Sequence, residues 1–125
     1  MTVQLNHTIV WCRDKTEGAA FVTDILGLPP AVPFADFLVV ELANGVSLDF
    51  AEKSGPVAVQ HYAFLIGEDE FDAIYDRIRE RGLGHWADPM RRRPGEINRN
   101  DGGRGLYFEG PDGHFLEVIT RPYGG

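Results

Sequence analysis

The chain has 125 residues, of which 43% are hydrophobic, and this is enough to form an ordinary folded core. Nineteen acidic against twelve basic residues give a formal net charge of −7, which argues against nucleic acid as a partner because phosphate binding favours a basic surface. No segment has the roughly 20 apolar residues that span a membrane, and the first residues do not resemble a secretory signal, so we expect a cytoplasmic protein with no membrane partner.

The first half of the chain predicts a strand, a helix and a hairpin in that order. Residues 5–11 alternate with period two, which places His7, Ile9 and Trp11 on one face of a strand. Asp14 and Glu17 form a capping-box pattern at the start of the following helix, which we expect to end at residue 27. A hairpin then turns at residues 44–45, between strands over 37–42 and 46–50. The single cysteine, Cys12, excludes an internal disulfide and a CxxC motif.

The second half repeats this order of elements. Residues 59–65 alternate with period two and again carry a histidine, His61, early in the strand. Residues 68–81 have acidic residues at the start, an apolar stripe and basic residues near the end, which predicts an amphipathic helix. Residues 82–87 are interpreted as a helix cap and turn, and a second hairpin follows with strands over 106–109 and 114–120.

The two halves can be aligned as copies of one βαβββ module. Residues 44–50 match residues 112–118, which places Asp49 opposite Glu117, and His7 opposite His61. The polar stretch 89–105 accounts for the extra length of the second copy. We therefore expect a single α+β domain over residues 1–125, with modules at about 3–53 and 57–121.

The ionisable residues of these strands share the sheet face that the helices do not cover. A carboxylate inside a strand as apolar as residues 115–119 needs compensation if it is buried. His7, His61 and Glu117, with Asp49 as an optional fourth ligand, suit a divalent metal that keeps open positions, whether zinc, nickel, manganese or iron(II). The alternative is a half-exposed sheet whose second face is merely polar.

A cluster of arginines lies in the polar stretch of the second half. Arg93 and Arg104 concentrate basic charge there in an otherwise acidic chain, and this favours contact with a small anion. The alternative interpretation is a solvated loop.

The pattern resembles the vicinal oxygen chelate superfamily, which includes glyoxalase I, extradiol dioxygenases, fosfomycin-resistance transferases and bleomycin-resistance proteins. The resemblance covers residues 3–121, and residues 111–117 (Pro-Asp-Gly-His-Phe-Leu-Glu) are its most specific part. It implies paired βαβββ modules whose mixed sheets curve around a cleft, a homodimer, and metal ligands at His7, His61 and Glu117. A three-ligand set is more typical of an iron(II) dioxygenase, and a fourth ligand at Asp49 of a glyoxalase or epimerase.

The resemblance implies two classes of function. The first is a metal-dependent enzyme, a lyase, isomerase or dioxygenase, whose metal chelates two neighbouring oxygens of a small-molecule substrate. The second is a bleomycin-resistance type of protein that sequesters an aromatic antibiotic in the cleft and needs no metal. The residues that we expect to contact a substrate or antibiotic are Trp11, Phe34, Ser47, Trp86, Met90, Tyr107 and Phe115. The sequence shows no clear acid-base pair of the dioxygenase type; Tyr107 and His85 are the only candidates that it offers.

Overall fold

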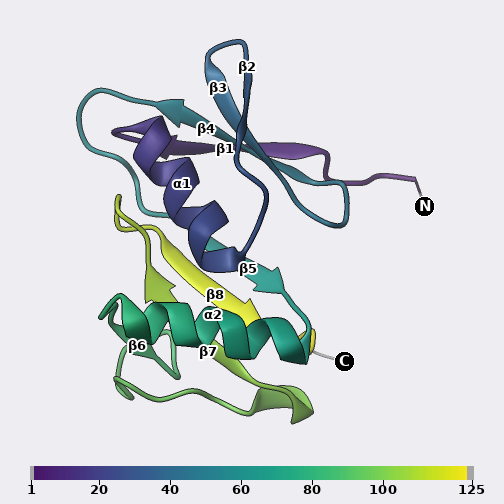
Figure 1. Cartoon of the computed structure of the whole chain (residues 1–125), viewed down its shortest axis with the longest axis vertical. Helices are drawn as coiled ribbons and strands as arrows, with labels where there is room; N and C mark the ends of the chain where they lie inside the picture. The colour runs from purple at the N-terminus through teal and green to yellow at the C-terminus, as the bar shows by residue number, and fades with distance from the viewer. Residues whose placement is uncertain (1, 124–125) are drawn as a thin grey trace. The chain divides into compact units, whose positions relative to one another are not determined.

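The computed structural model describes residues 2–123, and the chain divides into two compact units, residues 1–58 and 59–125. Each unit contains one α-helix and one four-stranded sheet (Figure 1). The expected α+β fold of two βαβββ modules is therefore confirmed. Neither helix in residues 2–123 is both long enough and apolar enough to cross a membrane.

The first unit contains β1 (His7–Cys12), α1 (Lys15–Leu26), β2 (Val32–Phe34), β3 (Phe37–Glu41) and β4 (Ser47–Glu52). The strand order is β1-β4-β3-β2, with β1 parallel to β4 and the other neighbours antiparallel. Helix α1 contacts β1, β3 and β4 and covers one face of this sheet. The opposite face carries the side chains that the sequence predicts to be functional, those of His7, Trp11, Ser47 and Asp49.

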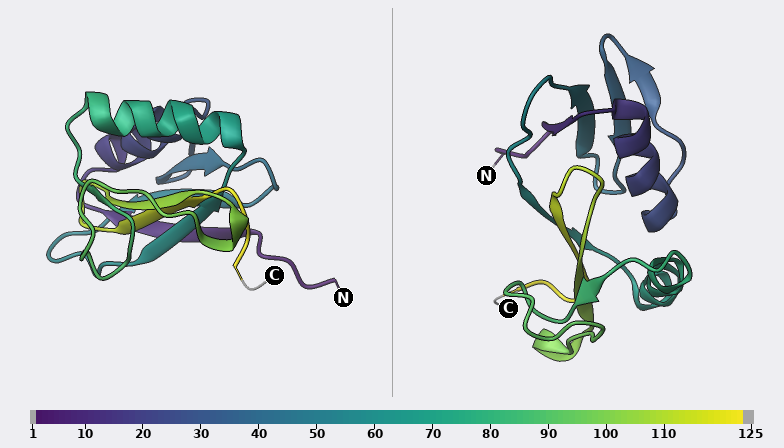
Figure 2. Two further views of the ribbon diagram at one scale, coloured as in Figure 1. Left: turned by 90° about the horizontal axis from the view of Figure 1, so that it is seen from below. Right: turned by 90° about the vertical axis from the view of Figure 1, so that its left-hand side faces the viewer.

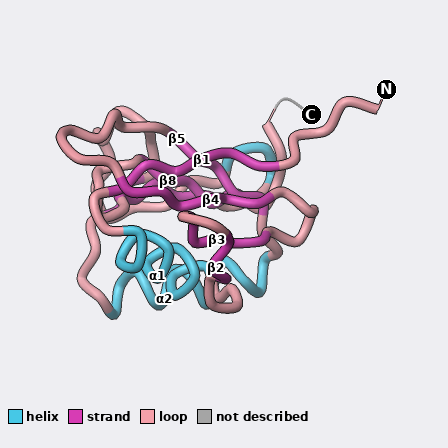
Figure 3. Tube along the Cα trace, turned by 90° about the horizontal axis from the view of Figure 1, so that it is seen from above, coloured by secondary structure: helices cyan, strands magenta, loops and turns pink. Residues whose placement is uncertain are grey.

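The second unit repeats this topology with a longer connection. It contains β5 (His61–Leu65), α2 (Glu68–Glu80), β6 (His85–Trp86), a short 3-10 helix (Asn100–Gly102), β7 (Gly105–Glu109) and β8 (Phe115–Ile119). The strand order is β5-β8-β7-β6, with β5 parallel to β8. Figures 2 and 3 show that the helix of each unit lies on one side of that unit's own strands.

Two short strands differ from the sequence prediction. Strand β6 lies within residues 82–87, which were interpreted as a cap and turn. Gly82 does end the helix region with a positive φ of 64°, but the chain then pairs His85 with Phe108 and Trp86 with Tyr107. The sequence does not locate β2 either, although each βαβββ module requires a strand between its helix and its hairpin. Elements of two or three residues are too short to show a period of two, so their pairing partners decide their conformation.

Helix α1 begins and ends where the sequence predicts. The Asp14 carboxylate accepts a hydrogen bond of 3.1 Å from the backbone N–H of Glu17, and Gly27 has the left-handed conformation that commonly follows a helix. We expect Asp14→Ala to lower the free energy of unfolding by about 1 kcal/mol, because an N–H group loses its acceptor. Urea unfolding measures this change, and Asp14→Asn, which keeps an oxygen acceptor at the same position, is the control for loss of charge alone.

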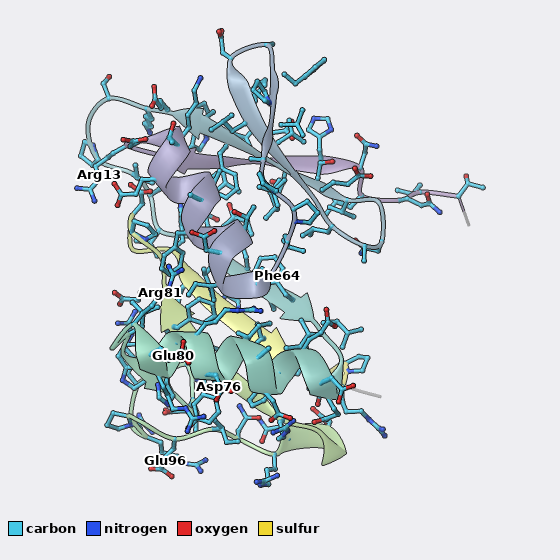
Figure 4. All side chains as sticks on the ribbon, in the orientation of Figure 1. Arg13, Phe64, Asp76, Glu80, Arg81 and Glu96 are labelled. Atoms are coloured by element: carbon cyan, nitrogen blue, oxygen red, sulfur yellow. The ribbon has the colours of Figure 1, made fainter. Side chains whose placement is uncertain are left out.

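Helix α2 separates an apolar face from a charged one. Phe71, Ile74 and Ile78 are buried, whereas Asp76 and Glu80 project from the side of the helix that faces the viewer in Figure 4. The first turn closes with the Glu70 carboxylate accepting a hydrogen bond of 2.8 Å from the backbone N–H of Gly67. The apolar face of α2 therefore packs on one face of the second sheet. The opposite face of that sheet is not covered by α2.

Candidate metal site and aromatic wall

The parallel pairing of β5 with β8 brings His61 and Glu117 together. His61 is in register with Phe115, and Ala63 is in register with Glu117, so the histidine and the carboxylate lie two positions apart on the same sheet face. The side chain of Glu117 is 1% exposed and that of His61 is 47% exposed. The site is therefore a buried carboxylate with a histidine at its open edge.

The hydrogen bonds of the His61 ring show which of its two nitrogens carries the hydrogen and which one faces Glu117. Its Nδ1 lies 2.8 Å from the backbone oxygen of Phe115, and because a carbonyl can only accept, Nδ1 carries the hydrogen. Its Nε2 lies 3.1 Å from Oε1 of Glu117. In the neutral ring this nitrogen presents a lone pair toward a carboxylate oxygen. The two atoms therefore need a cation between them, either a proton or a metal ion.

The second oxygen of Glu117 is held by tyrosine. The hydroxyl of Tyr123 donates a hydrogen bond of 2.5 Å to Oε2 of Glu117, and it lies 3.0 Å from the hydroxyl of Tyr107. Tyr107 lies opposite Glu117 in the antiparallel pairing of β7 with β8. The sequence predicts that a carboxylate buried in this strand needs polar partners, and the structure places one histidine and two tyrosine hydroxyls around Glu117.

These phenols should make stability sensitive to alkaline pH. Burial first and then the hydrogen bond with Tyr123 raise the pKa of Tyr107 above its ordinary value of 10.0, and burial followed by the hydrogen bond with Glu117 raises the pKa of Tyr123. Unfolded tyrosine ionises near pH 10, so above that pH the unfolded chain binds fewer protons than the folded one. The stabilisation is complete below roughly pH 10 and is lost as the pH rises toward the raised pKa values.

We expect the free energy of unfolding to fall above roughly pH 10, and to fall less steeply in Tyr107→Phe. Denaturant unfolding from about pH 8 to pH 11 measures this dependence. An identical slope for wild type and Tyr107→Phe would count against the raised pKa of Tyr107.

An aromatic wall borders the His61–Glu117 pair. The Tyr107 and Phe115 rings stack with centroids 5.3 Å apart, and the His61 and Tyr107 rings stack at 5.9 Å. Trp86 extends this wall, with its ring centroid 6.0 Å from that of Phe115. The sequence prediction places Trp86, Tyr107 and Phe115 at one ligand surface, and within the second unit they do contact one another.

Arg91 covers the outer part of this wall. Its guanidinium carbon lies 4.4 Å from the Phe115 centroid and 4.8 Å from the Trp86 centroid. The same guanidinium forms an ion pair with Glu109. Arg91 has a positive φ of 61°, an uncommon conformation for a residue with a side chain. A cation is therefore held over aromatic rings beside the candidate metal ligands.

The first unit carries the matching positions with different contacts. Asp49 is in register with Ile9, as Glu117 is with Ala63, and His7 is in register with Ser47. Nδ1 of His7 lies 2.8 Å from Oδ1 of Asn6, so this ring is oriented by a neighbouring side chain. Within residues 2–123, no three His, Cys, Asp or Glu side chains converge as a metal site. The ligating roles of His7 and Asp49 stay predictions from the repeat.

A groove of about 1040 Å³ lies on the first unit. Its lining includes four residues that the sequence selects: His7, Phe34, Ser47 and Asp49. Phe34 is 70% exposed, and Trp11 on β1 is 43% exposed. Apolar side chains and three ionisable ones, those of His7, Glu41 and Asp49, therefore share one accessible groove, which is the usual composition of a small-molecule site.

The remaining predicted residues lie outside the His61–Glu117 contacts. The Arg104 guanidinium donates hydrogen bonds to the carboxylates of Glu68 (2.7 Å) and Asp72 (2.8 Å), and these contacts hold α2. Arg93 pairs with Glu96 at 3.4 Å. Met90 is 69% exposed. An anion contact at Arg93 or Arg104 stays a prediction, and the structure gives Arg104 two carboxylate partners within the protein.

Comparison with known proteins places the chain in a family. The model of the Glyoxalase/Bleomycin resistance protein/Dioxygenase superfamily matches residues 4–118. Oxidase ChaP-H1 is 64% identical, with a TM-score of 0.97 and coverage of 99% of this chain and 100% of that one. Oxidase ChaP-H2 is 61% identical, with a TM-score of 0.97 and coverage of 100% and 98%.

A more distant relative is metallothiol transferase FosB of Lysinibacillus sphaericus (strain C3-41). It is 29% identical over 130 residues, which cover 96% of this chain and 84% of that protein. On the family match over residues 4–118, the chain belongs to the Glyoxalase/Bleomycin resistance protein/Dioxygenase superfamily.

Proposed function

We propose that this protein is a divalent-metal-dependent oxidase that acts on a planar aromatic small molecule with two neighbouring oxygen atoms. One observation carries the proposal: Nε2 of His61 and Oε1 of Glu117 lie 3.1 Å apart, while Nδ1 of His61 donates to a carbonyl. That arrangement directs a nitrogen and an oxygen donor toward one cation. His7 is the proposed third ligand and Asp49 an optional fourth, both assigned from the sequence repeat.

The donor set fits iron(II), manganese, nickel or zinc, because imidazole and carboxylate ligands suit all four. A bound divalent ion would supply Lewis acidity toward two neighbouring substrate oxygens and would stabilise the negative charge on them. The protein contributes the orientation of the ligands. Phe115 O fixes the His61 ring, and Tyr123 and Tyr107 fix the buried carboxylate.

The aromatic wall supports a planar substrate. Phe115 lies beside His61 and Trp86 beside Phe115, and both rings are half-buried, whereas Tyr107 is buried behind them; contact with two such rings favours flat aromatic molecules. Arg91 covers these two rings and pairs with Glu109, so a substrate that stacks there has to displace the guanidinium, which then becomes a cation suited to a phenolate or carboxylate. The aromatic wall and Arg91 together favour an aromatic substrate over a small aliphatic one.

The relatives favour oxidation over group transfer. The two proteins named oxidases are 64% and 61% identical to this chain, whereas the metallothiol transferase is 29% identical. The proposed oxidant is dioxygen. If two electrons and two protons leave the substrate, dioxygen becomes hydrogen peroxide, and if oxygen is inserted, its atoms enter the product.

Oxygen uptake tests the proposal. Protein loaded in turn with iron(II), manganese, nickel or zinc is mixed with planar aromatic diols such as 2,3-dihydroxynaphthalene, and dissolved oxygen and peroxide are followed. We expect uptake with at least one redox-active metal, and none in Glu117→Gln, which keeps the shape of the side chain but loses its charge. Tight binding of the diols, with quenched Trp86 fluorescence and unchanged ligand, would instead favour the sequestering function.

We also propose a homodimer in the cytoplasm. Large apolar side chains are exposed on the first unit, including Ile9 at 36%, Trp11 at 43%, Val32 at 64% and Phe34 at 70%. Such side chains are a frequent feature of protein contact surfaces. Sedimentation equilibrium tests this, and a monomer at all concentrations up to about 100 μM, a range in which even weak standard-sized interfaces associate, would overturn the dimer.

A further inference from the structure

The geometry points to Tyr123 as a positioning residue that keeps Glu117 a one-oxygen metal ligand. This inference rests on the proposed metal site. Oε1 of Glu117 faces His61 at 3.1 Å, and Oε2 accepts the hydrogen bond of 2.5 Å from Tyr123. The two oxygens of this carboxylate therefore have different tasks, and the phenol of Tyr123 decides which oxygen remains for a cation.

The environment keeps the carboxylate in this position. Glu117 lies in the middle of β8, between β5 and β7, and its side chain is 1% exposed, so it has little room to rotate. Tyr123 is 57% exposed as a residue, yet its hydroxyl reaches the buried Oε2 and also lies 3.0 Å from the Tyr107 hydroxyl. Tyr107 is anchored on β7. Tyr123 thus links a fixed strand residue to the carboxylate from a segment that follows the last strand.

The consequence concerns the number of open coordination positions. A carboxylate that binds through both oxygens fills two positions, and one that binds through a single oxygen fills one. A substrate that chelates through two neighbouring oxygens needs two adjacent open positions. By occupying Oε2, Tyr123 preserves a position that a bidentate carboxylate would fill. Hydrogen bonds to ligating carboxylates typically change metal affinity by roughly 10-fold to 100-fold when removed.

Cobalt(II) titration tests this role without measuring catalysis. Visible absorption of bound cobalt(II) reports coordination number, and the titration also gives the Kd. We expect Tyr123→Phe, which retains the ring but loses the hydroxyl, to change the cobalt spectrum toward a higher coordination number and to alter the Kd by about 10-fold. Tyr75→Phe is the matched control, because its ring lies on α2 and contacts Arg79 at 4.1 Å.

The spectrum decides the outcome. A Tyr123→Phe spectrum that matches wild type overturns the positioning role, whatever the Kd, and a changed spectrum with an unchanged Tyr75→Phe spectrum supports it. Failure of wild type to bind cobalt(II) would overturn the proposed metal site and the role of Tyr123 together. Far-UV circular dichroism and the apo-protein Tm of each variant show whether the fold is retained.

Discussion

Replacing His61 with alanine is expected to weaken metal binding by at least about 100-fold, because it removes a ligand rather than a group that merely orients one. His61 provides the Nε2 that faces Oε1 of Glu117 at 3.1 Å. Its side chain is 47% exposed, so its truncation leaves no enclosed cavity and the fold should be retained. Oxygen uptake, if the proposed activity is present, should be lost together with the metal.

The matched control is His85→Ala. His85 lies on β6 next to Trp86, but its ring contacts Tyr75 of α2, at 5.3 Å between centroids, on the helix side of the sheet. Titration with iron(II), manganese, nickel and zinc, read by calorimetry, compares the two variants. The account requires wild-type affinity in His85→Ala and a large loss in His61→Ala. Equal affinities in both variants would remove His61 from the site.

The second large effect concerns the packing of α2. Phe71 is fully buried, its ring is tilted against that of Tyr75 with centroids 5.9 Å apart, and its centroid lies 4.4 Å from the guanidinium carbon of Arg104. Phe71→Ala should lower the free energy of unfolding by about 3–5 kcal/mol, because the truncation removes apolar contacts and leaves a cavity. Arg104 would also lose the ring beneath it while it remains paired with Glu68 and Asp72.

Phe34→Ala is the control for this substitution. Phe34 is 70% exposed on β2, so at protein concentrations low enough to dissociate the proposed dimer the same truncation should change the free energy of unfolding by less than about 0.5 kcal/mol. Chemical denaturation followed by circular dichroism measures both variants. Similar losses for Phe71→Ala and Phe34→Ala would contradict the assignment of Phe71 to the core of the second unit.

The sequence predicts the strands that position the site because a period of two fixes the direction of every side chain. In β1 the residues Val10 and Cys12 are buried while His7, Ile9 and Trp11 are exposed, as the alternation requires. The same rule places His61 and Glu117 on one face, and the parallel register brings them into contact. Repetition of the pattern in both halves makes this part of the fold readable without coordinates.

The supporting residues of the site were not predictable in the same way. Tyr123 follows the last strand in a segment without periodicity, so nothing in the sequence directs its hydroxyl toward Glu117. Arg91 lies in the polar stretch that was predicted as an insertion, and its position over Phe115 depends on a left-handed backbone conformation. One signal was available: a buried glutamate in β8 requires hydrogen-bond donors, and phenols are among the candidates.

The sequence also selects two arginines whose contacts are within the protein. Basic charge in a polar stretch favours an anion site, but charge alone does not show which carboxylates are nearby. Arg104 reaches back to the first turns of α2, where Glu68 and Asp72 accept its hydrogen bonds. Arg104 is 36 positions from Glu68 and 32 positions from Asp72 in the sequence. Contacts over such a separation depend on the folded topology, which local sequence patterns do not encode.

Elemental analysis of the wild-type protein, purified without chelators and then dialysed against each metal, tests the central claim most directly. We predict about one divalent metal ion per chain in wild type and none in His61→Ala, since a site that lacks a ligand loses its ion on dialysis. Wild-type protein that takes up none of iron(II), manganese, nickel or zinc would contradict the assignment of His61 and Glu117 as metal ligands.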